Sequence, residues 1–399
     1  MALTPNPLGG QFKDKNLDLL ASLNQNICFP CTRVLFPAMR IVTADAEPNR
    51  PLHLPGMPTS RTNSPTIKDI ARLASVSHST VSRALRNSSL VGPKTTERIQ
   101  RIARKAGYRA SAVARGLVTQ ETRTIGVVVT TIADPFVSEV LSGIEETANL
   151  HGYSVFLAES NADSKREIEA VQSFAERWVD GIVVTSSRVG SLHFELLSEM
   201  KVPIVMVNNQ HPRASVHSVM IQNVEGSRQA VQHLLRLGHR RIAYIRDKFG
   251  YQSDAERLDG YRTALRQGGI EFSKELVVWG DGRAEGGMVA MRCLLGLEEP
   301  PTAVFCYNDM TALGALRCIY DERLKVPQDI SLVGFDDLFL ACYTQPRLTT
   351  VRQPRRQLGQ LAMESLLKLM SGQESVGAIT VPAELIVRES TAPPREVSE

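Results

Sequence analysis

Residues 66–87 read TIKDIARLASVSHSTVSRALRN and carry the clearest structural pattern of the chain. Its first apolar residues at helical spacing are Ile67, Ile70, Ala71 and Ala74. This spacing predicts a short helix with one apolar face. Thr66, with Asp69 three residues later, resembles a capping box that starts it. A tight turn around Ser75 and a second helix capped by Ser77 follow, and together they predict a helix-turn-helix.

The exposed face of the second helix is small, polar and basic. It carries His78, Ser79, Ser82, Arg83 and Arg86. No acidic residue occurs between Arg72 and Thr96. Such a face is compatible with the major groove of DNA, where acidic side chains would be repelled. The alternative is that it is simply a solvated face.

A third helix completes the helix-turn-helix domain at residues 65–110, which we call the head. Pro93 opens it, Gly107 ends it, and its apolar face carries Ile99, Ile102, Ala103 and Ala106. Between Arg61 and Leu117 the chain has twelve basic residues and two acidic ones, a local charge of +10. The whole chain has a net charge of +4, so the remainder carries −6. This imbalance indicates that the head is the part that meets a polyanion.

The composition excludes several classes of protein. The chain has 399 residues, of which 43% are hydrophobic and 22% charged, as in an ordinary globular protein rather than a disordered one. No apolar run approaches the length of a membrane span, and no secretory signal is visible, so we expect a cytoplasmic protein without membrane contact. Four of the six cysteines lie in apolar segments and are expected to be buried, reduced thiols. These are Cys293, Cys306, Cys318 and Cys342.

After Thr122, apolar runs alternate with amphipathic segments. The expected strands are 125–130, 153–159, 181–185, 204–208, 241–246, 303–307 and 331–335. The expected helices are 136–151, 165–177, 224–237, 255–267, 285–295, 310–321 and 355–370. This alternation predicts two doubly wound parallel sheets with helices on both faces, and ligands outside the carboxyl ends of the strands.

The expected organisation has five parts. Residues 1–64 are read as a disordered extension, 65–110 as the helix-turn-helix domain, 111–121 as a hinge helix or linker, 122–392 as a two-lobed effector-binding and dimerisation domain, and 393–399 as a disordered tail. Met57 is an alternative start of translation. The Cys28–Cys31 pair has no second ligand pair near it, so no metal is expected. His193, His217, His233 and His239 show no metal spacing and are expected at the surface or as caps.

The sequence 66–87 resembles the head of the lactose-repressor (LacI/GalR-type) family of transcription regulators. The resemblance continues through VGPKTTERI (91–99), AGY (106–108) and ARGL (114–117) to about Ser390. It implies a helix-turn-helix followed by a sensor similar to periplasmic sugar-binding proteins. The chain would cross between the two lobes near residues 220–222, 350–352 and 379–381.

The resemblance also implies which residues contact DNA. His78, Ser79 and Arg83 match positions that read base edges, with Arg86 beside them on the same face. Thr66, Ser77 and Thr80 match phosphate contacts, which fix register. The hinge helix matches Ser111 to Leu117, including Ala114, and Leu117 is placed to wedge between base pairs in the minor groove.

The expected effector site lies between the lobes. The resemblance assigns to it Asp134, Phe136, Asn208, Arg257, Asn308 and Asp336. A carboxylate, an amide and a guanidinium at strand ends suit a ligand with several hydroxyl groups. The alternatives are that Asp336 and Asn308 cap the following helices, and that Arg257 pairs with Asp254 or Glu256 at the surface.

One position departs from the family. Many members carry an aromatic residue after the pair Gly280-Asp281, whereas this chain has Gly282 and then Arg283. Trp279 lies three positions before Gly282 and is not expected to reach. We therefore expect either that a stacking surface is missing or that Arg283 favours an acidic or phosphorylated ligand.

The sequence thus predicts a dimeric transcription regulator, most simply a repressor, that binds a near-palindromic operator and is controlled by a sugar-like effector. No cofactor is expected. One alternative is a sensor controlled by a protein partner. The other is a doubly wound enzyme, against which stands the absence of a nucleotide-binding loop and of a nucleophile elbow.

Overall fold

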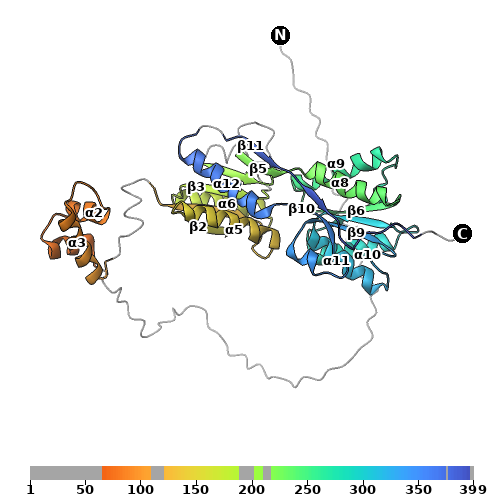
Figure 1. The fold of residues 1–399 in the computed structure, drawn as a ribbon, viewed down its shortest axis with the longest axis horizontal. Coiled ribbons are helices and arrows are strands. Elements are labelled where there is room, and N and C mark those ends of the chain that lie inside the picture. The colour runs from red at the N-terminus through yellow and green to blue at the C-terminus, as the bar shows by residue number, and fades with distance from the viewer. Residues whose placement is uncertain (1–64, 109–120, 188–201, 210–216, 374–375, 396–399) are drawn as a thin grey trace, which may run out of the picture. The chain divides into compact units, whose positions relative to one another are not determined.

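The computed structural model describes residues 65–108, 121–187, 202–209, 217–373 and 376–395 (Figure 1). The expectations for residues 1–64, for His193 and for the hinge residues Ser111, Ala114 and Leu117 lie outside these ranges.

The head consists of three helices around a small apolar core. They are α1 (Ile67–Ala74), α2 (His78–Leu85) and α3 (Pro93–Lys105). The capping box predicted for α1 is present: the Thr66 side chain accepts from the Asp69 N–H, and the Asp69 carboxylate accepts from the Thr66 N–H. Ile70, Val81 and Ile99, one from each helix, are fully buried against one another. The helix-turn-helix prediction is confirmed.

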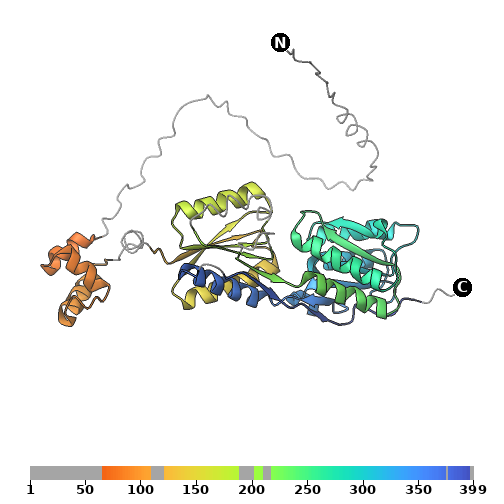
Figure 2. The same cartoon turned by 90° about the horizontal axis from the view of Figure 1, so that it is seen from above.

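The first lobe is a parallel sheet of six strands in the order β11-β5-β4-β3-β1-β2. Its strands are β1 (Thr124–Val129), β2 (Ser154–Glu159), β3 (Gly181–Thr185), β4 (Ile204–Val207), β5 (His217–Ile221) and β11 (Ala378–Val381). Its helices are α5 (Pro135–Leu150), α6 (Ser164–Glu176) and α12 (Arg355–Met370). Figure 2 shows α5 and α12 on one face and α6 on the other.

Helices α5 and α12 pack closely because two glycines lie at their contact. A Cβ on Gly359 would lie 2.0 Å from the carbonyl oxygen of Val140, and one on Gly143 would lie 2.1 Å from that of Arg356. Side chains of α12, including Leu358 and Met363, complete the core of this lobe. A late segment of the sequence is therefore built into the first lobe.

The second lobe is also a six-stranded sheet, in the order β12-β10-β9-β8-β6-β7. Its strands are β6 (Ile242–Asp247), β7 (Val277–Gly280), β8 (Ala303–Cys306), β9 (Ser331–Asp336), β10 (Thr349–Arg352) and β12 (Glu384–Ile386). Only the β10–β12 pairing is antiparallel. Helices α8 (Asn223–Arg236) and α9 (Gln252–Gln267) contribute to one core cluster, and α10 (Ala284–Leu295) and α11 (Asp309–Asp321) to another. Two short 3-10 helices, η1 (Lys274–Leu276) and η2 (Phe339–Cys342), join strands to their neighbours.

The chain passes between the lobes three times, as expected: from β5 into α8, from β10 into α12, and from β11 into β12. The two-sheet architecture is confirmed, and each predicted strand and helix of this region is present. None of the helices described is long and apolar enough to span a membrane.

Two expectations about single residues were wrong. Of the four cysteines in the described ranges, Cys293 and Cys342 are exposed, and Cys306 and Cys318 are buried. Cys293 lies in an apolar run, but α10 turns its neighbours Met291 and Leu294 inward instead. His239 is buried, not superficial, because its ring bonds the hydroxyls of Thr302 and Ser331 and the carbonyl of Ala392. Burial lowers the pKa of His239.

Candidate functional site

The exposed face of α2 is fixed by the cap at its first turn. The Ser77 Oγ accepts a hydrogen bond from the Thr80 N–H at 3.2 Å and lies 2.8 Å from the hydroxyls of both Ser79 and Thr80. His78 and Ser79 are exposed immediately after the cap. The start of α2 therefore presents a row of small polar donors and acceptors.

The basic residues of α2 lie one turn further on. The side chain of Arg83 is exposed and makes no ion pair or hydrogen bond with any described residue, so its guanidinium is available to a ligand. Arg86 folds back and donates to the carbonyl of Ser82 at 3.3 Å. Thr66 is exposed but already serves as the cap of α1. DNA contact by these residues remains a prediction.

A cleft of about 500 Å³ lies between the lobes. All six residues expected to contact an effector line it: Asp134, Phe136 and Asn208 from the first lobe, and Arg257, Asn308 and Asp336 from the second. They converge because the carboxyl ends of the parallel strands in both sheets face this cleft. Their binding role remains a prediction.

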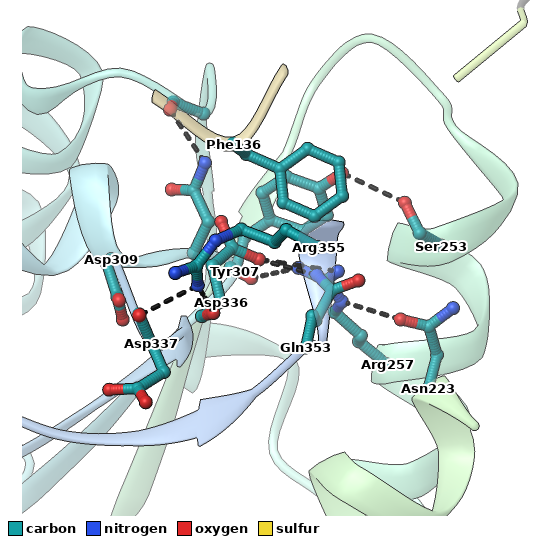
Figure 3. Close-up of polar contacts among 12 residues, drawn as sticks. Phe136, Asn223, Ser253, Arg257, Tyr307, Asp309, Asp336, Asp337, Gln353 and Arg355 are labelled. Atoms are coloured by element: carbon teal, nitrogen blue, oxygen red, sulfur yellow. Dashed lines mark hydrogen bonds and ion pairs between the residues drawn. The ribbon is translucent and has the colours of Figure 1, made fainter. Parts of the chain in front are cut away.

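Arg257 lines the cleft and is 3% exposed, and Figure 3 shows its polar contacts. Its Nε donates to the Asn223 side chain at 3.1 Å, its Nη1 donates to the carbonyl of Tyr307, and its guanidinium lies 3.7 Å from the ring centre of Phe335. Its Nη2 is 3.9 Å from Asp336. The alternative that Arg257 pairs at the surface with Asp254 or Glu256 is therefore wrong.

Asp336 and Asp337 point to different places, as expected for adjacent residues at a strand end. Asp336 is 4% exposed and accepts a hydrogen bond from the Gln353 amide at 2.6 Å. Asp337 instead pairs with Arg352 and Arg388. Burial raises the pKa of Asp336 to about 7, although Arg257 opposes the shift. The backbone of Asp336 has φ = 117°, a strained conformation for a non-glycine residue.

Asn308 serves two purposes at once. Its Oδ1 accepts from the Thr311 N–H at 2.8 Å and so caps α11, as the alternative reading proposed. Its Nδ2 donates to the carbonyl of Gly282 at 2.9 Å. This second bond ties the end of β8 to the loop that follows β7, on the wall of the cleft.

The first lobe contributes an acid, a ring and an amide. Asp134 caps α5 by accepting from the Phe136 N–H at 2.9 Å, and burial raises the pKa of Asp134. Phe136 is 7% exposed. Asn208 has φ = 55°, and its buried Oδ1 has no hydrogen-bond partner among the described residues. The unpaired oxygen is free to accept a bond from a ligand.

Sequence reasoning missed several residues of the cleft. They include Asp247, Phe249, Tyr251, Ser253, Tyr307 and Gln353. Asp247 had a readable signal, since it ends a predicted strand just as Asp336 does. Tyr307 had none, because its place depends on the hydrogen bond of its hydroxyl with Ser253 at 2.9 Å across the cleft wall.

The two alternatives for position 282, a missing stacking surface or a charge that Arg283 offers to the ligand, stay predictions. Trp279 does lie outside, 57% exposed and stacked on Arg246 at 4.0 Å. Other rings, however, line the cleft in its place: Phe136, Phe249, Tyr251 and Tyr307. Arg283 lines the rim and is exposed. Within the described ranges no cluster of His, Cys, Asp and Glu has the arrangement of a metal site.

Comparison with known families gives two matches. Residues 66–111 match the family of bacterial regulatory proteins of the lacI type, and residues 231–391 match the periplasmic binding protein-like domain. The first match covers the helix-turn-helix and the second covers most of the second lobe.

Whole-chain comparisons agree. The HTH-type transcriptional repressor CytR of Escherichia coli K12 is 39% identical over 330 residues, covering 82% of this chain and 96% of that protein. Among solved structures, the Lac repressor dimer bound to operator and the anti-inducer ONPF has a TM-score of 0.75 at 29% identity, covering 82% of this chain and 99% of that one. The transcriptional regulator CelR in complex with cellobiose has a TM-score of 0.62 at 32% identity, with the same coverage. The chain therefore belongs to the lacI family of bacterial regulatory proteins, a DNA-binding transcriptional regulator with a periplasmic-binding-protein-like sensor.

Proposed function

We propose that this chain is a repressor that acts as a homodimer on a near-palindromic operator and is controlled by a small, sugar-like effector. It works in the cytoplasm, where the DNA is, and it is not an enzyme. One observation carries the proposal: the same chain joins α2, with its exposed polar and basic side chains, to a cleft lined by buried polar side chains.

Specificity for the operator resides on α2. Its exposed side chains His78, Ser79 and Arg83 face outward after the Ser77 cap. An arginine pairs bidentately with guanine, which contributes roughly 1–3 kcal/mol of discrimination. Thr80 and Thr66, with Ser77, contact phosphates and fix the register. Ser111, Ala114 and Leu117, which lie outside the described residues, would contact the minor groove, as the family resemblance implies.

The effector occupies the cleft. Its volume of about 500 Å³ falls in the range of small-molecule sites. Arg257, Asn308 and Asp336 provide donors and acceptors for hydroxyl groups, and the aromatic residues provide apolar contact. A partner protein would need no such enclosed set of buried polar groups, so the cleft favours the small molecule over the protein-controlled alternative.

The DNA part is tested by selecting duplexes from a random-sequence pool with the full chain. We expect a consensus of two inverted half-sites, because a symmetric dimer reads a symmetric sequence. The matched variant Arg83→Ala should lose preference at one base pair in each half-site. A selection that yields no consensus, or one without symmetry, would contradict the proposal.

The effector part is tested by thermal unfolding of the full chain with a panel of saccharides. A ligand at 100 times its dissociation constant adds roughly 2.7 kcal/mol to the free energy of unfolding. The expected result is a saturable shift that Arg257→Ala abolishes and that accompanies a change in operator affinity. A panel that gives no shift would favour control by a protein partner.

A further inference from the structure

Asp247 is a second buried acidic residue of the second lobe that lines the cleft, besides Asp336. It ends β6, is 1% exposed and lines the cleft. Its Oδ1 accepts from the Phe249 N–H at 2.7 Å. Its Oδ2 makes no hydrogen bond with any described residue. The structure thus holds a nearly buried carboxylate with one oxygen unused.

The space over this oxygen is open because residue 282 is glycine. A Cβ at Gly282 would lie 3.0 Å from Asp247 Oδ2 and 3.7 Å from Asn308 Nδ2. Gly282 also has φ = 73°, a conformation that side-chain-bearing residues rarely adopt. No side chain at position 282 therefore covers the carboxylate, and a ligand group can approach it from the cleft.

Two described cations near Asp247, Arg257 and Lys248, are already engaged elsewhere. Arg257 is bonded to Asn223 and Tyr307 and lies beside Asp336. Lys248, the next residue along the chain, points outward and pairs with Asp281 at 3.6 Å. Asp247 therefore has no ion pair with a described residue.

The acidic residues lining the cleft outnumber the basic ones. The acids are Asp134, Asp247, Asp281, Glu285 and Asp336, and the bases are Arg257 and Arg283. Burial raises the pKa of Asp247 to about 6, and the charges of Asp254 and Asp281 contribute to the rise. At neutral pH the carboxylate is still mostly ionised, and a cationic group beside it would relieve the cost of its charge.

We propose that the effector carries an amino group, protonated at neutral pH, that lies over Gly282 and donates to Asp247 Oδ2. The inference rests on the cleft being the effector site, and it makes Asp247 the residue that distinguishes an amino from a hydroxyl substituent. A phosphate in the same place would meet two carboxylates, those of Asp247 and Asp281. The geometry thus replaces the expectation of a phosphorylated ligand, which depended on Arg283, with that of an amino-substituted polyol.

The test measures the affinity of the full chain for matched sugars. The probes are glucose, glucosamine and glucose 6-phosphate, and cellobiose with its diamino analogue. We expect an amino sugar to bind about tenfold or more tightly than its neutral counterpart, as for a charge-assisted hydrogen bond, and the phosphate to bind most weakly. Asp247→Asn keeps the shape of the side chain but removes its charge, and it should bring the two affinities to within about twofold.

Asp259→Asn is the control, because Asp259 lies exposed on α9 outside the cleft and its removal changes net charge equally. It should leave the amino preference unchanged. Operator binding by each variant shows whether it is folded. A neutral or phosphorylated sugar that binds best, an amino preference that survives Asp247→Asn, or no binding of either amino sugar would overturn the proposal. None of these results would affect the selection of a symmetric operator sequence. The proposal of an amino effector and that of an operator-binding dimer can therefore be contradicted independently.

Discussion

Arg257 illustrates how one side chain organises the cleft. It is buried, its charge faces Asp336, and its other donors hold Asn223 and the backbone of Tyr307. We expect Arg257→Lys to lower the free energy of unfolding by about 1–3 kcal/mol, because a lysine leaves buried acceptors unpaired. Urea unfolding followed by circular dichroism measures the change.

Arg262→Lys is the matched control for that variant. Arg262 lies on the same helix, is exposed, and stacks on Phe272 at 4.5 Å. A surface change of this kind should stay within about 0.5 kcal/mol of the unaltered chain. If the two substitutions changed the free energy of unfolding equally, the buried contacts of Arg257 would contribute nothing beyond those of a surface arginine.

Because of Asp247, we expect the free energy of unfolding to depend on pH. Burial raises the pKa of Asp247 to about 6 in the folded chain, above its ordinary value of 3.8, so the folded state resists ionisation. The penalty for ionising Asp247 lowers the free energy of unfolding as the pH rises from 3.8 to about 6, and it is fully present above that pH. Asp247→Asn removes this penalty. We expect the variant without ligand to be more stable by about 1–3 kcal/mol at pH 8, at roughly 1.4 kcal/mol for each pKa unit.

The advantage of Asp247→Asn should shrink as the pH falls below about 6, because the native carboxylate then gains its proton while the unfolded one has not. Thermal unfolding at pH 8 and at pH 5.5 measures the difference. Asp259→Asn should show no such dependence. An Asp247→Asn variant less stable than the unaltered chain at pH 8 would mean that the carboxylate has a stabilising partner.

The expected base contacts all lie on one short helix, α2. We expect Arg83→Ala to weaken binding to the selected operator by about 1–3 kcal/mol while changing binding to random duplex far less. The reason is that base contacts specify, whereas phosphate contacts only position. Fluorescence anisotropy with both duplexes measures the two affinities.

Arg101→Ala removes the same charge from α3, where Arg101 pairs with Glu97 at 3.0 Å. Its effect should be equal on operator and on random DNA. If Arg83→Ala also weakened the two equally, Arg83 would be a phosphate contact rather than a reader of sequence.

The elements were largely predictable because both sheets are built from buried apolar runs, such as residues 125–129 in the first sheet and 303–306 in the second. Five strands of the described region were missed. Two of them, β5 and β10, lie inside their sheets, where polar residues such as Ser218 and Thr350 break the apolar pattern. β7 spans four residues and ends at Gly280, while β11 and β12 lie at the outer edges of their sheets and have one buried residue between them, Val381. Short edge strands lack the continuous apolar pattern that marks a buried one.

The site was predictable where a residue ends a strand. Asn308 and Asp336 could be placed in this way, because parallel strands end at one edge of a sheet. The partners of Arg257 could not, because they come from α8 and β9 and meet only through packing. The burial of His239 likewise depends on a carbonyl at Ala392, far along the chain.

The affinity of the whole dimer for its operator should depend steeply on salt concentration. If two heads together neutralise about six phosphates, the logarithm of the binding constant falls with that of salt concentration with a slope of about −5. The excess of basic residues between Arg61 and Leu117 is the source of this dependence. Titrations of operator DNA in 50 to 200 mM salt, over a range of about fourfold, measure the slope.

Arg101→Ala, which removes one positive charge, should reduce the magnitude of that slope by no more than about 1 per head. The effector should leave the slope for random duplex unchanged, because it binds the sensor. A slope near zero for operator DNA would contradict binding driven by phosphates.

The placement of α12 in the first lobe has a consequence for how the protein is made. Strands β1 to β5 have been synthesised once translation reaches Ile221. Helix α12, which closes their core, is synthesised only at residues 355–370. Nearly all of the second lobe is complete before then. The growing chain therefore carries an open apolar face on its first lobe for more than a hundred residues of translation. A product terminated at Arg352 would keep that face permanently exposed, a target for chaperones and proteases despite an almost finished second lobe.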